Sequence, residues 1–239
     1  MRPLKEFFAD YHANGYDDEI LSDWGSALLY RPIGLTLAWL LSATRTTPNS
    51  VTAIAAMLLP LMVVATTLCQ PVTALHIVLF LAIIYLILDC TDGSLARMTG
   101  HVSVSGHYFD LVTDLAYRGC VYVTVGYLAD QIDPLPFPVN QMSCMALAAW
   151  FAALARLARM NLDRLAPRSI AEKSDQKAAA TFTFYSFLSG IDTLFPLFVV
   201  IAYTVDVLSF FIPWIVFYSL ADVIVALLEA RGRLRSYPR

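Results

Sequence analysis

Residues 74–97 read ALHIVLFLAIIYLILDCTDGSLAR, an apolar run that ends in two aspartates three residues apart. An α-helix of about 20 apolar residues is long enough to cross the hydrocarbon core of a bilayer. The run therefore predicts a membrane-spanning helix whose last turns carry Asp89 and Asp92.

The composition of the whole chain is that of a membrane protein. Of its 239 residues, 58% are hydrophobic and only 15% are charged, whereas about 25% of the residues in a soluble domain are charged. The net charge of −3 excludes a nucleic-acid partner, which would call for a basic surface. The four cysteines have no CxxC spacing and are predicted to be free, buried residues: Cys69, Cys90, Cys120 and Cys144.

Further apolar segments of similar length flank this run on both sides. Together they predict an all-α integral membrane protein with six transmembrane helices, at residues 50–69, 74–97, 106–129, 142–160, 181–203 and 208–230. Prolines lie between several of these segments, as expected at helix boundaries. We expect Asn49 or Ser50 to cap the first spanning helix, and residues 50–232 to form one membrane domain.

Residues 1–49 are predicted to form a cytoplasmic and interfacial segment. Residues 1–23 lack the long apolar core of a cleavable signal peptide. The apolar stretch 32–43 is too short to span alone and favours an amphipathic helix lying along the membrane surface. The alternative is that it spans together with its flanks. The acidic run 17–19 is expected to cap or shield this helix, and residues 233–239 form a basic tail.

The placement of lysine and arginine predicts the orientation in the membrane. These residues lie near both termini and after the helices at 74–97 and 142–160, whereas the loops near Gln70, Asp133 and Asp206 contain none. Positive residues favour the cytoplasmic side. Both termini and the site described next are therefore predicted to face the cytoplasm, in the cell (inner) membrane.

Four aspartates lie on two neighbouring predicted helices. Asp89 and Asp92 share one helix face, and Asp110 and Asp114 share another. A short connection makes the two helices antiparallel, so their carboxylates should converge at one end of the membrane. Such a cluster must be protonated or neutralised by cations. Oxygen ligands suit Mg²⁺, Mn²⁺ or Ca²⁺, and two such ions suit displacement at phosphorus.

Small residues accompany the aspartates. Gly93 and Ala96 follow the first pair, and Gly106 precedes the second. The absence of bulky side chains would open a slot for a flat base or a diphosphate. The alternative is close packing between helices, which small residues also favour in membranes.

This part of the chain resembles the signature of the CDP-alcohol phosphotransferase family, whose pattern reads Asp89-x2-Asp92-Gly93-x2-Ala96-Arg97-x8-Gly106-x3-Asp110-x3-Asp114. Every fixed position of that signature is present. The segment Thr47-Pro48-Asn49 also resembles one that precedes the first spanning helix in this family.

The resemblance implies a six-helix fold, a homodimer, and transfer of a phosphoalcohol group from a CDP-alcohol to a hydroxyl acceptor with release of CMP. It implies two divalent ions, Mg²⁺ or Mn²⁺ with Ca²⁺ as another occupant, bound by Asp89, Asp92, Asp110 and Asp114. Asp114 would also be the general base. The implied nucleotide pocket is lined by Asn49, Gly93, Ala96, Arg97 and Gly106.

Several arginines near the predicted site are candidates for binding an acceptor phosphate: Arg118, Arg156 and Arg159. Alternatively, Arg118 is a counter-charge to the aspartates, and the basic residues at 156–177 signal topology or bind anionic lipid headgroups. The histidines that flank the site loop, His101 and His107, are expected to be solvated. Two further intramembrane acids, Asp192 and Asp222, are either functional or paired with these arginines.

The expected partners are CDP-diacylglycerol as donor, a small polar alcohol as acceptor, and membrane lipids, which places the reaction in phospholipid biosynthesis. A CDP-choline or CDP-ethanolamine donor with a lipid acceptor fits the same pattern. A divalent-cation transporter is a rival of another class, although its acids should extend through the membrane rather than cluster at one end. The intact signature disfavours an inactive assembly partner.

Overall fold

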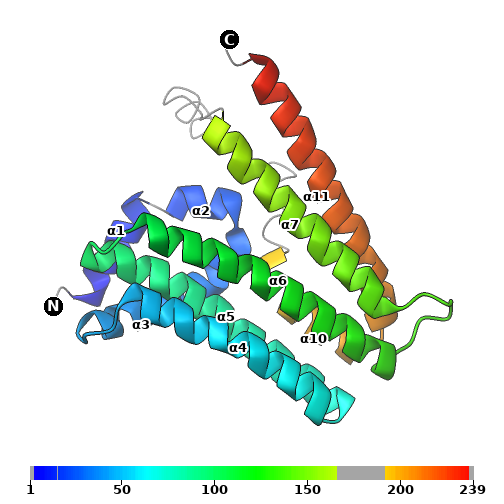
Figure 1. The fold of residues 1–239 in the computed structure, drawn as a ribbon. Coiled ribbons are helices and arrows are strands. Elements are labelled where there is room, and N and C mark those ends of the chain that lie inside the picture. Colours follow the sequence, from blue (N-terminus) through cyan, green and yellow to red (C-terminus); the bar gives the residue numbers. More distant parts are fainter. Residues whose placement is uncertain (1–2, 15, 166–191, 237–239) are drawn as a thin grey trace. The chain divides into compact units, whose positions relative to one another are not determined.

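The computed structural model describes residues 3–14, 16–165 and 192–236, and within these ranges the chain is helical with no strand (Figure 1). The N-terminal segment forms α1 (Leu4–Asn14), α2 (Tyr16–Ser22), a π-helical turn η1 (Ser26–Tyr30) and α3 (Arg31–Ser42). Six helices follow within the described residues: α4 (Pro48–Leu68), α5 (Pro71–Thr99), α6 (Val104–Ile132), α7 (Gln141–Leu165), α10 (Phe195–Thr204) and α11 (Leu208–Ser236). The predicted all-α class is confirmed.

Among the described residues, α4, α5, α7 and α11 are long and apolar enough to cross a membrane, so the chain is a helical membrane protein. Helix α6, at 29 residues, has the length but not the apolar character, since it carries Asp110, Asp114 and Arg118. The predicted helix 181–203 lies partly outside the described residues, and α10 forms its last part.

The observed helices extend beyond the predicted spans. Helix α5 continues to Thr99 and stops at Gly100, whose φ of 70° gives the left-handed conformation that ends many helices. Helix α7 continues to Leu165, five residues beyond the predicted end. Hydropathy locates only the apolar part of a helix, which is the part that lies in lipid. The helix itself continues until its backbone is capped, so it can be longer than the apolar segment.

The predicted cap of α4 is wrong. Thr47, rather than Asn49 or Ser50, precedes the helix, and its side chain accepts a hydrogen bond from the Ser50 backbone N–H. Pro48 occupies the first helical position, where its fixed φ and missing N–H are favourable. The helix therefore begins earlier than expected.

The chain divides into two compact units. Unit 1 comprises Met1–Tyr117 and Phe182–Ile201, and unit 2 comprises Arg118–Thr181 and Ala202–Arg239. The first half of α6 belongs to unit 1 and the second half to unit 2.

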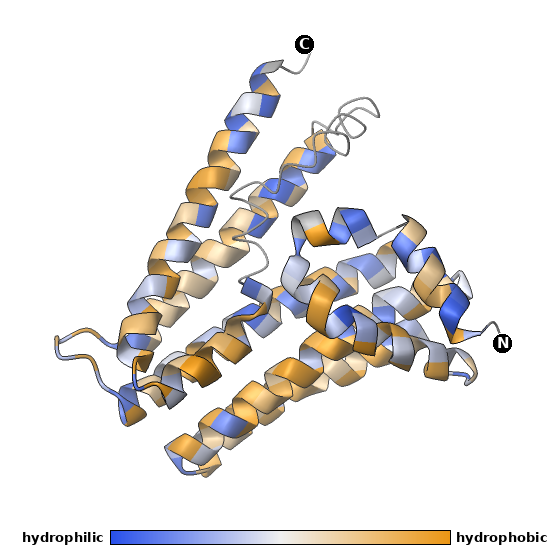
Figure 2. Cartoon of the chain, turned by 180° about the vertical axis from the view of Figure 1, so that it is seen from behind, coloured by the Kyte–Doolittle hydropathy of each residue, from blue (hydrophilic) through white to orange (hydrophobic). Residues whose placement is uncertain are grey.

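Helix α5 is the centre of unit 1, because both α3 and α4 pack against it (Figure 1). The three helices meet at Ala38, Val51 and Leu95, of which none is more than 2% exposed. Figure 2 shows long hydrophobic stretches on α4 and α5, with more hydrophilic residues toward the N-terminal helices. The polar end of α5, which carries Asp89 and Asp92, thus lies in the region that α3 covers.

In unit 2, α7 packs along α11, with Ala155, Val223 and Ala226 buried between them. Asp130, near the end of α6, accepts hydrogen bonds from the backbone N–H groups of Gln141 (2.7 Å) and Met142 (3.0 Å). The acid therefore satisfies two amides in the first turn of α7, which have no partner within their own helix.

Candidate active site

Asp92 is held by a hydroxyl from a neighbouring helix. Its carboxyl group is on α5, and the Thr52 hydroxyl of α4 donates a hydrogen bond to its Oδ2 atom. Both residues are 6% exposed. A hydroxyl orients a carboxylate without neutralising it, so Asp92 keeps the capacity to bind a cation.

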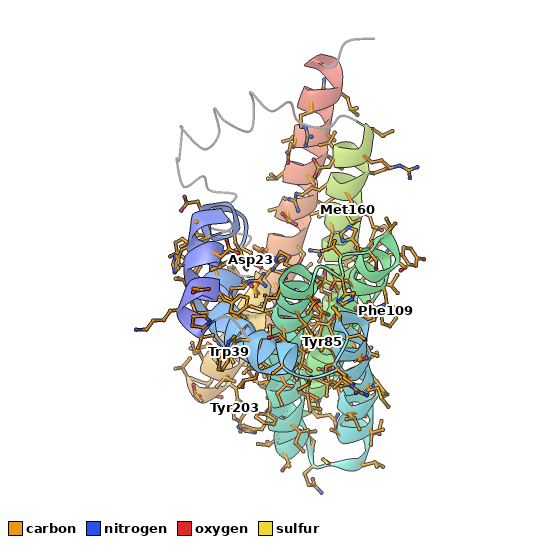
Figure 3. The ribbon with its side chains drawn as sticks, turned by 90° about the vertical axis from the view of Figure 1, so that its left-hand side faces the viewer. Asp23, Trp39, Tyr85, Phe109, Met160 and Tyr203 are labelled. Atoms are coloured by element: carbon orange, nitrogen blue, oxygen red, sulfur yellow. The ribbon has the colours of Figure 1, made fainter. Side chains whose placement is uncertain are left out.

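Two stacked tyrosines join α5 to the first half of α6. The rings of Tyr85 and Tyr117 are parallel within 3°, with centroids 4.1 Å apart, and the Tyr117 hydroxyl donates to the Ala82 carbonyl at 3.4 Å. Tyr85 lies among the packed helices, whereas Asp23 and Trp39 belong to the N-terminal segment (Figure 3). Because Tyr85 lies one turn before Asp89, this stack fixes the two acid-bearing helix faces close to each other.

The carboxylates of the predicted motif lie near one another in unit 1. The charges of Asp89, Asp110 and Asp114 all act on Tyr85, and that of Asp110 acts on Asp92. Within residues 3–14, 16–165 and 192–236, however, no three His, Cys, Asp or Glu side chains form a group that could hold a metal ion. The acids are neighbours, but their side chains do not form a closed coordination shell.

A cavity of about 320 Å³ opens beside Asp92, between the start of α4, the end of α5 and the start of α6. This volume is in the range of small-molecule sites. Its lining includes every residue predicted for the nucleotide pocket together with two of the aspartates: Asn49, Gly93, Ala96, Arg97, Gly106, Asp92 and Asp110. Asp89 and Asp114 are not among the lining residues.

The two glycines keep this cavity open. An added Cβ at Gly106 would lie 3.2 Å from Asn49 Oδ1 and 3.0 Å from Ser103 Oγ, and one at Gly93 would lie 3.6 Å from Arg97 Nη1. Side chains at either position would therefore take up space within the cavity.

Sequence reasoning missed several residues of this site. Thr52 contacts Asp92 from 40 residues away in the chain, and no local pattern marks such a partner. Ser103 lines the cavity and caps the start of α6, where its hydroxyl accepts from the Gly106 N–H at 3.0 Å. His101 and His107 also line the cavity, and both are exposed, as expected of solvated side chains.

The arrangement agrees with a comparison of the whole sequence against protein families. Residues 45–221 match the family model for CDP-alcohol phosphatidyltransferase. The chain belongs to this family. No curated protein was found to match it.

Members of the CDP-alcohol phosphatidyltransferase family transfer a phosphoalcohol group from a CDP-alcohol, so the chain is a membrane-embedded transferase of this class. The match covers α4 to the first half of α11 and the whole cavity lining. It leaves α1, α2, η1 and α3 outside, although α3 packs against α5.

In this family member, all three predicted acceptor-binding arginines belong to unit 2. Arg159 of α7 donates to both carboxylate oxygens of Asp222 in α11, with Nη1 to Oδ2 at 3.1 Å and a shorter contact from Nη2 to Oδ1. The charges of Arg118, Arg159 and Asp222 all act on Tyr218. Asp222, which was expected to be either functional or paired with an arginine, is paired with Arg159 at the end of the fourth predicted span.

The remaining basic residues are only partly described. Arg156 is half-buried on α7, and Arg164 is exposed near its end. Arg168, Lys173 and Lys177 lie outside the described residues. The prediction that this basic segment binds an acceptor phosphate or lipid headgroups stays a prediction.

Proposed function

We propose that this transferase moves a phosphatidyl group from CDP-diacylglycerol to a small polar alcohol and releases CMP, as a step in phospholipid biosynthesis. The observation that supports the proposal most is the cavity of unit 1. Its lining brings Asn49, Gly93, Ala96, Arg97 and Gly106 beside Asp92 and Asp110. The cavity therefore combines a slot lined by small residues, the guanidinium of Arg97 and two carboxylates.

The donor set suits hard divalent cations. Asp92 and Asp110 line the cavity, and Asp89 and Asp114 are their neighbours around Tyr85. Carboxylate oxygens are ligands that Mg²⁺ and Mn²⁺ accept. Two bound divalent ions would set four positive charges against the four carboxylates and the donor diphosphate. Because the side chains form no such cluster as they stand, the proposal requires the carboxylates of α5 and α6 to draw together around the ions.

The cavity residues would bind and orient the CDP group. The slot beside Gly93 and Ala96 can receive a flat base, and the Arg97 guanidinium can donate to phosphate oxygens. Asn49, opposite Gly106, can offer its amide to the base or the ribose. Each of these residues acts through contact with the donor rather than through chemistry of its own.

Asp114 would be the general base. It lies one turn from Asp110 and is 9% exposed. Its carboxylate would accept the proton of the acceptor hydroxyl as that oxygen bonds to the phosphorus that carries the alcohol. The bond from this phosphorus to the oxygen of the cytidine phosphate would break, and CMP would leave with that electron pair.

The acceptor would bind near Arg118 and Arg156 if it carries a phosphate. Arg159, held by Asp222, would fix the neighbouring polar groups and offer its remaining donors. This assignment rests on the charge of these arginines and on their positions along α6 and α7.

The proposed setting is a cell membrane crossed six times, with α6 and the segment around α10 added to the four apolar spans. Helix α3 would lie along the interface, ahead of a membrane domain at residues 50–232 and a basic tail at 233–239. Both termini and the cavity would face the cytoplasm, as the lysine and arginine distribution predicts. A homodimer is proposed from the family resemblance alone.

The deciding experiment measures CMP release from purified protein with CDP-diacylglycerol and Mg²⁺ or Mn²⁺, over a panel of acceptor alcohols. We expect release with at least one acceptor, and none after the divalent ions are chelated. Turnover that persists in excess chelator would contradict the metal assignment.

The alternatives have their own readouts. CMP release only from CDP-choline or CDP-ethanolamine with diacylglycerol would show that the lipid is the acceptor and that the CDP-linked headgroup is the donor. Cation uptake into proteoliposomes without CMP release from any donor would favour a transporter, although the cavity beside Gly93 and Arg97 fits a nucleotide better than a passing ion.

A further inference from the structure

One arginine of the N-terminal segment, Arg31, binds α5 and α2 at the same time. Arg31, the first residue of α3, donates from Nη1 to the Cys90 carbonyl oxygen at 3.0 Å and to Ser94 Oγ at 3.2 Å. From Nε it donates to both carboxylate oxygens of Glu19, at 2.8 and 2.9 Å. The two charged side chains are only 15% and 16% exposed. One planar guanidinium thus joins α2 to α5.

Other side chains of the N-terminal segment converge on the same ion pair. The Tyr11 hydroxyl donates to Glu19 Oε2 at 2.9 Å, and Ser26 Oγ donates to Glu19 Oε1 at 3.2 Å. Burial, together with the charge of Glu19, raises the pKa of Tyr11, so its hydroxyl keeps its proton and remains a donor. Ser26 Oγ also lies 3.3 Å from Cys90 Sγ. Helices α1 and α2 and the turn η1 therefore all contribute to holding Arg31 in place.

Helix α3 lies against α5 with no space between them at this level. A Cβ added at Gly34 would lie 2.7 Å from Cys90 Cβ and 3.1 Å from the Cys90 carbonyl carbon. Only glycine allows such an approach. Gly34 lies one turn after Arg31, so the steric contact and the hydrogen bonds act on the same stretch of α5.

That stretch carries the proposed metal ligands. Cys90 lies between Asp89 and Asp92, and Ser94 follows Gly93. Arg31 therefore binds α5 two residues before and two residues after Asp92, while Thr52 binds the Asp92 carboxylate itself from α4. This turn of α5 is held by α3 and α4, and neither contact neutralises the charge of Asp92.

From this geometry we infer that Glu19 and Arg31 are positioning residues, which fix the α5 turn of Asp89 and Asp92 and so set the affinity of the site for divalent cations. The inference rests on the proposed function for the identity of the metal ligands. Both residues lie outside the region 45–221 that the family model matches, so the chain supplies this support from its N-terminal segment. Residues that orient metal ligands typically change metal affinity by about 10- to 100-fold.

Lysine cannot replace arginine at position 31 without loss of hydrogen bonds. Arginine presents donors in a rigid planar fork, whereas lysine has one flexible ammonium group. A lysine at position 31 keeps the charge next to Glu19 but cannot bind Glu19, the Cys90 carbonyl and Ser94 in the same geometry. Arg31→Lys therefore separates a need for charge from a need for position, and it leaves no unpaired acid behind.

The test uses Mn²⁺ alone as the probe, so that it does not depend on any donor or on turnover. The purified full-length protein is titrated with MnCl₂ while its melting temperature is recorded. We expect Arg31→Ala and Arg31→Lys to need about tenfold more Mn²⁺ for half-maximal stabilisation, and Glu19→Gln about threefold more. The matched controls Arg45→Ala and Glu6→Gln alter exposed residues and should stay within twofold of the wild type.

A lower melting temperature without metal, combined with an unchanged Mn²⁺ midpoint, would make the pair purely structural and overturn the inference. Full recovery of the midpoint in Arg31→Lys would also overturn it. Absence of Mn²⁺ stabilisation in the wild type would remove both this inference and the proposed metal site. If the midpoint shifts as expected but no donor releases CMP, the positioning role stands and the proposed transfer reaction fails.

Discussion

Two acids on candidate membrane spans, Asp92 in unit 1 and Asp222 in unit 2, have different neighbours. Asp92 accepts a hydrogen bond from the Thr52 hydroxyl and lines a cavity that also contains Asp110. Asp222 binds the guanidinium of Arg159 through both of its carboxylate oxygens. One acid is oriented while its charge remains available, whereas the other is paired with a fixed charge of opposite sign.

The difference shows how to interpret an acid inside a membrane protein. Such residues are functional candidates by default, because the low dielectric makes their charge costly. When a carboxylate is paired with an arginine, its negative charge is neutralised within the protein. A carboxylate that faces other carboxylates beside an open cavity still requires compensation, and a cation is the direct way to supply it.

The comparison is tested most strongly by removing each charge in turn. We expect Asp92→Asn to lower CMP release by about 1,000-fold or more, because it removes a proposed metal ligand, and Asp222→Asn to lower it by less than about tenfold. Steady-state assays of both variants at saturating Mg²⁺ measure the contrast. Equal losses in the two variants would mean that the ion pair of unit 2 is as essential to the chemistry as the cavity.

The role of Asp114 can be separated from metal and nucleotide binding. Asp114→Asn should reduce kcat by about 100- to 10,000-fold, the usual range for loss of a general base. Binding of the CDP donor, followed by calorimetry, should change much less. A variant with full turnover would remove the general-base assignment, and one that no longer binds the donor would make Asp114 chiefly a ligand.

In unit 2, breaking the ion pair should affect stability more than chemistry. Arg159→Ala leaves a partly buried carboxylate without its partner and should destabilise the protein by about 2 kcal/mol. The double variant Arg159→Ala/Asp222→Ala should recover part of that loss. Thermal unfolding in detergent measures both, and Arg235→Ala, at an exposed position of α11, is the matched control. An unchanged melting temperature in Arg159→Ala would show that the pair contributes no net stability.

The smallest expected effect concerns the orientation of Asp92. Thr52→Val keeps the shape of the side chain but removes the hydroxyl that binds Asp92 Oδ2, and it should raise the Mg²⁺ concentration for half-maximal activity by about tenfold. Thr67→Val is the control in the same helix, since the Thr67 hydroxyl donates to carbonyls of its own helix. Equal metal requirements for both variants would imply that the carboxylate is oriented without Thr52.

Much of the site could be anticipated from sequence, because its residues are close together in the chain. The aspartate spacings on α5 and α6, with Gly93, Ala96, Arg97 and Gly106 between them, occupy one short window. The cap at Thr47 was also within reach of a local rule, since Pro48 marks the first turn of α4. The predicted cap was wrong because hydropathy locates the apolar residues of a helix and not its first hydrogen-bonded turn.

The partners of the site could not be anticipated in the same way. Arg31 reaches Cys90 across 59 residues, Thr52 reaches Asp92 across 40, and Arg159 reaches Asp222 across 63. Each pairing depends on which helix faces pack together. Glu19 was predicted only to cap or shield the interfacial helix, and the hydrogen bonds that it accepts from Arg31, Tyr11 and Ser26 emerge only from the fold.

The sequence by itself determined that the chain is helical, where its apolar segments lie and where four aspartates are spaced along two of them. These properties follow from hydropathy, helical periodicity and local capping, which act between residues near each other in the chain. The tertiary structure alone decided that Asp92 meets a hydroxyl and a cavity while Asp222 meets an arginine. A charge is compensated by whatever lies next to it in space, and that neighbour is set by the packing of distant helices.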